Sequence, residues 1–351
     1  MLGVRRYLEE AVENGASDIF IVSGKPVSYK RDGIISPRDD EGVMPHTANK
    51  LVLSIYELAE RATDRFFTTG DDDFSLSVSG LSRFRVSTYR QRGSMAAVIR
   101  VVRFDTPDPN TLSIPKEVMK LAQKTNGLAL VTGPAGGGKT TTLACVIDAI
   151  NQNRNAHIIT LEDPIEFLYR NKKSIISQRE VGTDTDSYLT ALRACLRQAP
   201  DVILLGEMRD YDTIRTAMTA AETGHLVLSS LHTVGAVNTI DRIIDVFPPN
   251  QQQQIRVQLS MVLQTVISQQ LVPSVNGELL PVFEIMHLTS SIRNLIRESK
   301  THQIDFVIQS SAQEGMCGMD NALLELYAQK RISAETALHY CRNTEQMTRK
   351  L

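Results

Sequence analysis

Gly133-Pro134-Ala135-Gly136-Gly137-Gly138-Lys139-Thr140 is the stretch that decides the fold around it. It matches the pattern G-x-x-x-x-G-K-[ST] of a phosphate-binding loop, or P-loop. An apolar run at 128–132 precedes it and predicts a buried strand, and residues 139–151 predict a helix. Glycines let backbone N–H groups approach phosphate oxygens, and the start of the helix adds positive partial charge. A glycine-rich turn with a chance lysine would not need these flanking elements, so the sequence predicts nucleotide binding.

The loop also predicts the residues that contact the nucleotide. Lys139 can reach the β- and γ-phosphates of ATP, and the Thr140 hydroxyl can bind Mg²⁺. The expected nucleotide-binding residues are Gly133, Pro134, Ala135, Gly136, Gly137, Gly138, Lys139, Thr140 and Thr141.

Bulk composition indicates an ordinary globular protein. A length of 351 residues favours two domains, and a net charge of −2 with no Trp offers little to a nucleic-acid partner. The four cysteines are scattered without a C-x-x-C pair, which disfavours a zinc site or a disulfide framework. No signal region and no apolar stretch near the roughly 18 residues of a membrane span is found. We therefore expect a cytoplasmic protein without a transmembrane segment.

Periodicity predicts two domains of different class. Residues 1–104 alternate helices with antiparallel strands, for example at 74–78, and form a small α+β module. Residues 105–111 carry two prolines and predict a linker. From 112 to 351 buried strands alternate with helices, which predicts an α/β domain with a mainly parallel sheet and a helical C-terminal part. Its expected strands lie near 128–132, 157–161, 202–206 and 225–230, its helices near 139–151, 186–198, 210–222 and 235–244, and a later strand pair near 267–272 and 280–285.

Two predicted strands of the α/β domain end in a carboxylate. Glu162 follows an apolar run and precedes Asp163-Pro164, so it can orient and deprotonate an attacking water; a capping turn is the other interpretation. Glu207 follows residues 202–206 in the manner of a Walker B strand, which makes it a candidate for Mg²⁺ or its water shell. Ligands of open α/β sheets bind at the carboxyl ends of the strands, so both carboxylates are candidate catalytic groups.

Two histidines flank the strand near 225–230. His232 falls just beyond its end, where it can contact the γ-phosphate, and His225 falls at its start. We interpret His232 as catalytic, and for His225 a catalytic and a structural role are both open.

Exposed arginines are candidates for completing a γ-phosphate site. Arg193 and Arg197 are spaced i, i+4 on the helix expected at 186–198. The strands of the first module carry a further set that includes Arg85 and Arg100. Most such residues form solvated faces, but one or two of these four can act as arginine fingers within a subunit or across an interface.

Together, these motifs resemble those of the type IV pilus retraction ATPases (PilT-type) of the secretion-ATPase superfamily. The resemblance covers nearly the whole chain. It is carried by the P-loop and by residues 15–19, 83–86, 161–167, 206–210, 223–233, 291–298 and 302–304. The stretch that best separates retraction ATPases from the wider superfamily is Ile292-Arg293-Asn294-Leu295-Ile296-Arg297-Glu298.

The resemblance implies a PAS-like first domain, a RecA-like P-loop ATPase domain and a homo-hexameric ring that binds ATP and Mg²⁺. It implies a motor that drives pilus retraction at the cytoplasmic face of the inner membrane. Its expected partners are a membrane platform protein and, in some systems, a second pilus ATPase. Residues 292–298 would couple hydrolysis to movement, although a C-terminal packing helix needs no such role. Glu162 and Glu207 are supported as the catalytic carboxylates without a division of their roles.

Departures from the family pattern are few. Ala135, Gly137 and Thr140 stand where Thr, Ser and Ser are usual, and Ser291 stands where Ala is usual. The sequence leaves two alternatives open: an export ATPase of a secretion system, and a regulatory nucleotide-binding partner of another pilus motor.

Overall fold

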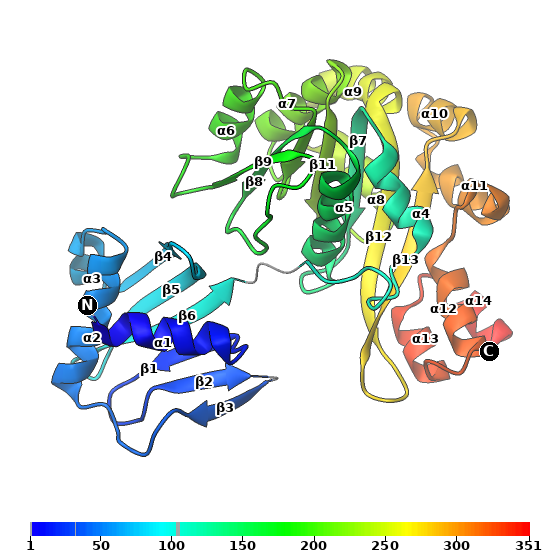
Figure 1. The fold of residues 1–351 in the computed structure, drawn as a ribbon. Helices are drawn as coiled ribbons and strands as arrows, with labels where there is room; N and C mark the ends of the chain where they lie inside the picture. The colour runs from blue at the N-terminus through cyan, green and yellow to red at the C-terminus, as the bar shows by residue number, and fades with distance from the viewer. Residues whose placement is uncertain (1, 32, 103–105) are drawn as a thin grey trace. The chain divides into compact units, whose positions relative to one another are not determined.

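The computed structural model describes residues 2–31, 33–102 and 106–351 (Figure 1). The chain divides into two compact units, Met1–Asp105 with Glu166–Leu168 and Thr106–Ile165 with Tyr169–Leu351. The predicted domain end at 104 and linker start at 105 lie outside the described residues. No helix in the described ranges is long and apolar enough to cross a bilayer.

An antiparallel sheet forms the first unit. Counting described residues, it has six strands in the order β3-β2-β1-β6-β5-β4. Its strands are β1 (Asp18–Ile21), β2 (Ser28–Arg31), β3 (Ile34–Pro37), β4 (Asp71–Val78), β5 (Ser82–Gln91) and β6 (Ser94–Val102), and its helices α1 (Leu2–Glu13), α2 (Pro45–Leu58) and α3 (Asp64–Thr69). Alternate residues of β4 are buried, as the sequence predicts. The sequence did not predict β2 and β3, because β3 is exposed along its whole length and carries no burial pattern.

A mainly parallel sheet forms the centre of the second unit. Within the described part it has seven strands in the order β13-β12-β7-β11-β10-β8-β9, and β13 alone runs antiparallel to its neighbour. The strands are β7 (Gly127–Thr132), β8 (His157–Glu162), β9 (Ile175–Glu180), β10 (Val202–Leu205), β11 (Leu226–Leu231), β12 (Leu263–Pro273) and β13 (Leu279–His287).

Helices cover both faces of this sheet (Figure 1). Successive residues of β7 show why, because Leu128 and Leu130 pack in the core on one face while Ala129 and Val131 pack in the core on the other. A strand buried on both faces needs the continuous apolar run that the sequence contains. The α-helices described in the second unit are α4 (Lys116–Met119), α5 (Lys139–Asn153), α6 (Tyr188–Cys195), α7 (Tyr211–Glu222), α8 (Ala236–Asp245), α9 (Pro249–Val262), α10 (Ser290–Arg297), α11 (Ile304–Ser310), α12 (Met319–Ala328), α13 (Ala334–Tyr340) and α14 (Thr344–Lys350).

Local capping explains where the helices near the carboxyl edge begin. Asp210 caps α7 by accepting the backbone N–H of Thr213 at 2.9 Å, so the chain leaves β10 and starts a helix after a short loop. Ser187 caps α6 in the same way. The predicted helix at 186–198 is shorter in the structure, since α6 ends at Cys195.

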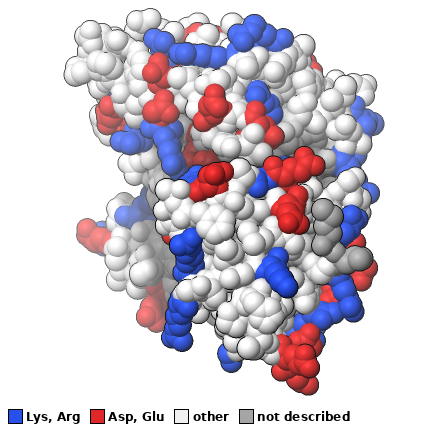
Figure 2. All heavy atoms as spheres, turned by 90° about the vertical axis from the view of Figure 1, so that its left-hand side faces the viewer, with Lys and Arg blue, Asp and Glu red and all other residues white. Residues whose placement is uncertain are grey.

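The predicted fold class is confirmed: an α/β unit with a mainly parallel sheet follows a smaller α+β unit with an antiparallel sheet. Basic and acidic side chains are interspersed on the face drawn in Figure 2.

Candidate nucleotide-binding site

The P-loop joins β7 to α5, as the sequence predicts. Gly133, Gly136 and Gly138 have positive φ angles of 144°, 73° and 81°. A Cβ at Gly133 would lie 2.0 Å from the backbone carbonyl oxygen of Gln269, and one at Gly138 would lie 2.7 Å from the Gln269 side-chain amide. The loop therefore needs glycine at both positions, because a strand passes directly beneath it.

Gln269 is a residue of this site that sequence reasoning missed. It lies on β12, is 2% exposed, and accepts a hydrogen bond from the Thr142 hydroxyl of α5 at 2.7 Å. Gln269 thus holds the first turn of α5 against β12 and fixes the orientation of the P-loop. No local motif marks Gln269, so the sequence had no signal for it.

Lys139 lies inside the loop rather than in solvent. Its ammonium group donates to the carbonyl oxygens of Gly133 at 3.0 Å and Pro134 at 2.8 Å, and the residue is 7% exposed. A buried ammonium that is held by backbone carbonyls is a cation positioned for phosphate. Thr140, the next residue, is exposed, and Thr141 is half-buried.

His232 connects the P-loop to the carboxylate of the neighbouring strand. Its Nδ1 lies 3.5 Å from Lys139 Nζ, and its Nε2 lies 3.5 Å from Glu207 Oε2. Strand order explains the alignment, since β11 lies between β7 and β10, and all three end at the same edge. The structure therefore brings together Lys139, His232 and Glu207, three residues that were predicted separately.

Glu162 ends β8, one strand beyond β10, and is 6% exposed. The Thr160 hydroxyl donates to its Oε1 at 2.7 Å, and the Gln178 side-chain amide donates to the same oxygen at 3.2 Å. The sequence predicted neither donor: Thr160 lies on a predicted strand without a motif that marks it, and Gln178 lies on β9, which was not predicted. These hydrogen bonds hold the Glu162 carboxylate in one orientation.

Two further residues border the carboxylates. Arg209 forms an ion pair with Glu207 Oε1. Tyr188, the first residue of α6, has a raised pKa because of burial and because Asp163, Glu207 and Glu162 carry negative charge nearby. A Cβ at Gly206 would lie 2.7 Å from the Tyr188 hydroxyl, so this phenol packs against the end of β10. Arg209 stood within a motif that carried the family resemblance, whereas Tyr188 had no sequence signal.

The structure does not bring His225 to this site. Its Nδ1 donates to the Ala220 carbonyl oxygen at 2.9 Å and lies 3.2 Å from the Thr223 hydroxyl, at the amino end of β11. The six residues of β11 span about 20 Å at ~3.3 Å per residue. His225 therefore lies at the opposite edge of the sheet from the P-loop, and of its two open roles the catalytic one stays a prediction.

The four candidate arginine fingers lie in two different units of the chain. Arg193 is exposed on α6, and Arg197 is exposed in a turn beyond the end of α6, so the expected i, i+4 pair on one helix is wrong. Arg85 and Arg100 are register partners on β5 and β6 of the first unit. Arg100 pairs with Asp18 at 2.9 Å, and Arg85 is exposed.

The candidate coupling segment forms α10, whose cap is Thr289. Ile292 and Ile296 are buried, and Leu295 packs beside them. Arg297 Nε donates to the Ser260 hydroxyl of α9 at 2.9 Å, so the last turn of α10 is held against α9. Arg293 is half-buried, and Asn294 and Glu298 are exposed.

A cavity beside the loop fits a nucleotide. Its volume is about 310 Å³, and its lining includes Leu112, Ile114, Gly138, Thr141, Gln269 and Leu271. Apolar walls next to the start of α5 suit an aromatic base, while the glycines leave open backbone for phosphates.

The site also contains oxygen atoms of the kind that would hold a magnesium ion. Mg²⁺ in nucleotide sites takes one or two protein oxygens and completes its shell with phosphates and waters. The Thr140 hydroxyl and the Glu207 carboxylate supply such oxygens. Within the described residues no cluster of three or more His, Cys, Asp or Glu could hold a metal ion by itself.

Comparison with known proteins agrees with this geometry. The family model described as "Type II/IV secretion system protein" matches residues 2–280. The type IV pilus retraction ATPase PilT of Pseudomonas aeruginosa is 40% identical over 336 residues, which cover 96% of this chain and 97% of that protein. The type IV pilus ATPase PilU of the same organism is 38% identical over 334 residues, which cover 95% of this chain and 87% of that protein.

A solved structure extends the likeness to three dimensions. The crystal structure of the pilus retraction motor PilT with bound ADP has a TM-score of 0.89 and 44% identity, and the match covers 98% of each chain. The family resemblance expected from the motifs is thus confirmed. The chain belongs to the type II/IV secretion system protein family, and within it to the PilT-type pilus retraction ATPases.

Proposed function

We propose that this protein is a Mg²⁺-dependent ATPase motor, assembled as a homo-hexamer, that drives retraction of type IV pili. The observation that carries the proposal is the alignment of Lys139, His232 and Glu207 at one edge of the sheet. It is supported by the match to PilT along 96% of the chain.

The P-loop would bind the phosphates of ATP. Backbone N–H groups of the loop donate to phosphate oxygens, and Lys139 exchanges the carbonyl oxygens of Gly133 and Pro134 for the β- and γ-phosphates. This exchange needs little movement, because the ammonium group already lies within the loop.

Glu162 and Glu207 would divide the carboxylate roles. Glu207 lies next to His232 and nearer to the P-loop in strand order, so with Thr140 it would hold Mg²⁺. The ion supplies positive charge that offsets the charge on the transferring phosphoryl group.

Glu162 would accept the proton of the attacking water, with Thr160 and Gln178 orienting its carboxylate. The water oxygen bonds to the γ-phosphorus as the bond to the bridging oxygen breaks, and ADP and phosphate form.

His232 would report on the γ-phosphate. A ring between Lys139 and Glu207 changes its hydrogen bonds when phosphate arrives or leaves. Arginines from the proposed PAS-like domain (1–104) and from the RecA-like ATPase domain (112–351) would complete the site within or between subunits, and the candidates are Arg85, Arg100, Arg193 and Arg197.

The segment of residues 292–298 would transmit the change to an inner-membrane pilus platform protein, at the cytoplasmic face of that membrane. Its two isoleucines anchor α10 in the core, while Arg293 and Asn294 remain accessible to a partner.

The test is turnover by the purified protein combined with pilus imaging in the bacterium that carries the gene. Lys139→Ala should abolish nucleotide binding and turnover, and deletion of the gene should leave excess pili that do not retract. Bald cells would indicate assembly, and unaltered pili with lost protein export would indicate a secretion ATPase; either result would overturn the proposal.

A second candidate is a regulatory nucleotide-binding partner of another pilus motor, which the likeness to PilU favours. Turnover separates the two candidates. A protein that binds nucleotide but shows no hydrolysis, with or without Glu207→Ala, would be the regulatory partner.

A further inference from the structure

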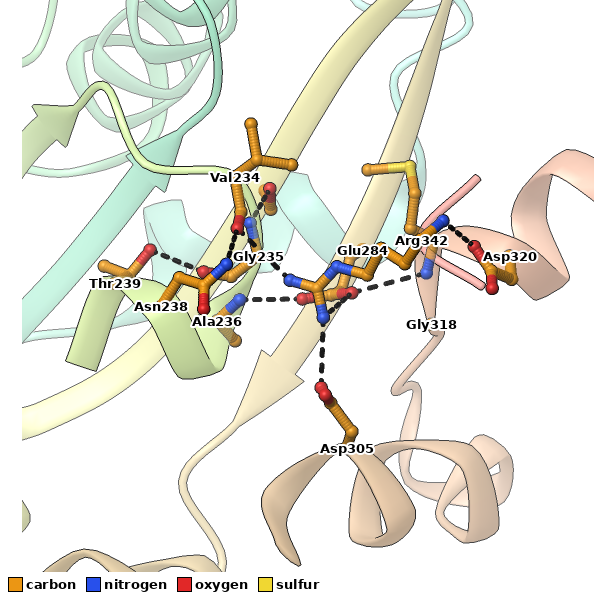
Figure 3. Close-up of polar contacts among 12 residues, drawn as sticks. Val234, Gly235, Ala236, Asn238, Thr239, Glu284, Asp305, Gly318, Asp320 and Arg342 are labelled. Atoms are coloured by element: carbon orange, nitrogen blue, oxygen red, sulfur yellow. Dashed lines mark hydrogen bonds and ion pairs between the residues drawn. The ribbon is translucent and has the colours of Figure 1, made fainter. Parts of the chain in front are cut away.

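A polar network outside the nucleotide-binding residues joins the C-terminal helices to the segment that follows His232 (Figure 3). Its centre is the guanidinium group of Arg342, in the loop between α13 and α14. Arg342 Nη2 donates to the Val234 carbonyl oxygen at 3.3 Å, and Nη1 pairs with Glu284 at 3.3 Å and Asp305 at 3.1 Å. Glu284, Asp305 and Arg342 come from distant parts of the chain. They therefore meet at Val234, which is two positions after His232.

We propose that Arg342 is a positioning residue for His232, and that helices α12–α14 thereby control the geometry of the nucleotide site. The proposal rests on the function proposed above for Lys139, His232 and Glu207.

The backbone at Gly235 shows how closely Arg342 is fitted. Gly235 has φ 91°, and a Cβ at this position would lie 0.9 Å from Arg342 Nη2. The guanidinium group thus occupies the space that a side chain would take, and it lies directly against the main chain. A residue other than glycine at 235 would displace Arg342 as well as strain the backbone.

A buried carboxylate makes the contact demanding. Glu284 of β13 is 2% exposed. Its Oε1 accepts a hydrogen bond at 2.7 Å from the Ala236 N–H, the first backbone amide of α8. Its Oε2 faces Arg342 and the Met319 N–H at 3.4 Å. Burial raises the pKa of Glu284, while Arg342 acts in the opposite direction. Without Arg342, the buried Glu284 carboxylate would lack its counter-ion and would no longer be held in place. The segment 234–236, which donates the Ala236 N–H to Glu284, would then lose a fixed hydrogen-bond acceptor.

The C-terminal helices hold Arg342 from the other side. Asp320, near the start of α12, accepts the backbone N–H groups of Arg342 at 2.7 Å and Asn343 at 3.1 Å. A movement of α12 would therefore shift the guanidinium group together with its backbone.

The segment after His232 is also tied to the strand that precedes the P-loop. The Thr239 hydroxyl donates to the Gly235 carbonyl oxygen at 2.7 Å, and it lies 2.7 Å from the Thr233 hydroxyl and 3.4 Å from the Thr132 hydroxyl of β7. The Ser268 hydroxyl of β12 accepts the Gly235 N–H at 2.7 Å. Residues 233–236 are thus held between the central sheet and Arg342.

His232 is sensitive to this support. Both of its ring contacts, to Lys139 and to Glu207, have lengths of 3.5 Å, the outer limit of a hydrogen bond. A displacement of the following residues by a fraction of an ångström would break one of them. Loss of Arg342 should therefore impair turnover more than nucleotide binding.

Hydrogen–deuterium exchange of the full-length, nucleotide-free protein tests the proposal without relying on activity. Arg342→Ala should raise exchange of the peptide covering 231–238 at least tenfold, with peptides of β8 and α5 unchanged. The matched control is Arg349→Ala, which removes an exposed arginine of α14 that pairs with Glu345. It should leave exchange at 231–238 at the wild-type value.

Kinetics give the second measurement. We expect Arg342→Ala to lower kcat about tenfold while KM for ATP and affinity for ADP stay within threefold, since the P-loop is intact. Arg342→Lys keeps the charge beside Glu284 but cannot also reach Val234 and Asp305, so it should fall between wild type and Arg342→Ala in both measurements. If Arg342→Ala does not fold, Arg342→Lys alone carries the test.

Exchange that rises only in residues 319–350, with normal exchange at 231–238 and normal kcat, would show that Arg342 merely packs the C-terminal helices, and would overturn the inference. Failure of the proposed function is a separate result. A wild-type protein without turnover would exclude the ATPase motor, whereas the exchange of 231–238 would still report on the positioning role.

Discussion

His232 Nε2 lies 3.5 Å from Glu207 Oε2, and this contact joins the ends of two adjacent parallel strands. The other ring nitrogen of His232 faces Lys139. The imidazole therefore lies where a change at the phosphates would reach the carboxylate on the next strand.

Replacement of this histidine should separate turnover from binding. We expect His232→Gln to lower kcat by about 10- to 100-fold, because one polar contact near the transferring group is lost, while ADP affinity stays within threefold. Steady-state kinetics and a fluorescent-ADP titration measure the two quantities. The control is His302→Gln, an exposed histidine of the C-terminal part. Equal losses of kcat and ADP affinity would contradict the assignment.

Replacement of Glu162 and replacement of Glu207 should have different effects on the kinetics. Glu162→Gln removes the proposed base, so kcat should fall by about 10²–10⁴-fold with an unchanged Mg²⁺ requirement. Glu207→Gln removes a proposed metal oxygen, so the Mg²⁺ concentration needed for half-maximal turnover should rise. Titration of Mg²⁺ at saturating ATP measures both. The reverse pattern would exchange the two roles.

Glycines of the P-loop differ in what surrounds them. Gly133→Ala places a methyl group 2.0 Å from the Gln269 carbonyl oxygen, so we expect lost nucleotide binding and destabilisation by about 2–4 kcal/mol. Gly136→Ala meets no atom within 4 Å and should cost only about 1–2 kcal/mol for its positive φ. Thermal unfolding and ADP titration compare the pair. Similar effects at both positions would show that Gln269 does not constrain the loop.

The ion pair of Glu10 with Arg38 predicts a pH dependence in the first unit. Arg38 donates to Glu10 Oε1 at 2.8 Å, and the Tyr29 hydroxyl donates to Oε2 at 3.0 Å. These contacts lower the pKa of Glu10 to about 2, chiefly through Arg38. The stabilisation is complete above the ordinary pKa of 4.5 and is lost as the pH falls towards 2.

Glu10→Gln should therefore destabilise the first unit by about 1–2 kcal/mol at neutral pH. The difference from wild type should shrink below pH about 4.5. Hydrogen exchange of β1 and β6 peptides between pH 7 and 3.5 reports on this unit. Glu9→Gln is the control, because Glu9 forms an exposed pair with Arg5 at 2.9 Å. If the stability difference between Glu10→Gln and wild type grew at acidic pH, the predicted direction of the pH dependence would be wrong.

Residues of α10 should separate anchoring from coupling. Arg293→Ala changes an accessible side chain, so ATP turnover should remain within twofold while pilus retraction is lost. Ile292→Ala should instead destabilise the protein by about 2–5 kcal/mol, because Ile292 is fully buried. Turnover, thermal unfolding and imaging of retraction are compared, with Lys350→Ala as an exposed control. Normal retraction in Arg293→Ala would remove this residue from the coupling segment.

The sequence alone determined the features that depend on near neighbours. The P-loop, the apolar runs of β7 and β10 and the helix expected near 210–222 follow from the spacing of a few adjacent residues, since strand and helix periods act locally. Predictions failed where the local sequence pattern is weak. Strand β9 was not predicted because few of its residues are buried, and helix α6 ends before Arg197, earlier than predicted.

Only the tertiary structure decided which distant residues share a site. Gln269 meets Thr142 across 127 positions, and Arg342 meets Val234 across 108 positions. Neither contact leaves a periodic signal, because it depends on how strands order themselves in the sheet and on where the C-terminal helices pack. The same packing placed His232 beside Lys139 and sent His225, seven residues earlier, to the opposite edge, since a strand separates its two ends by its full length.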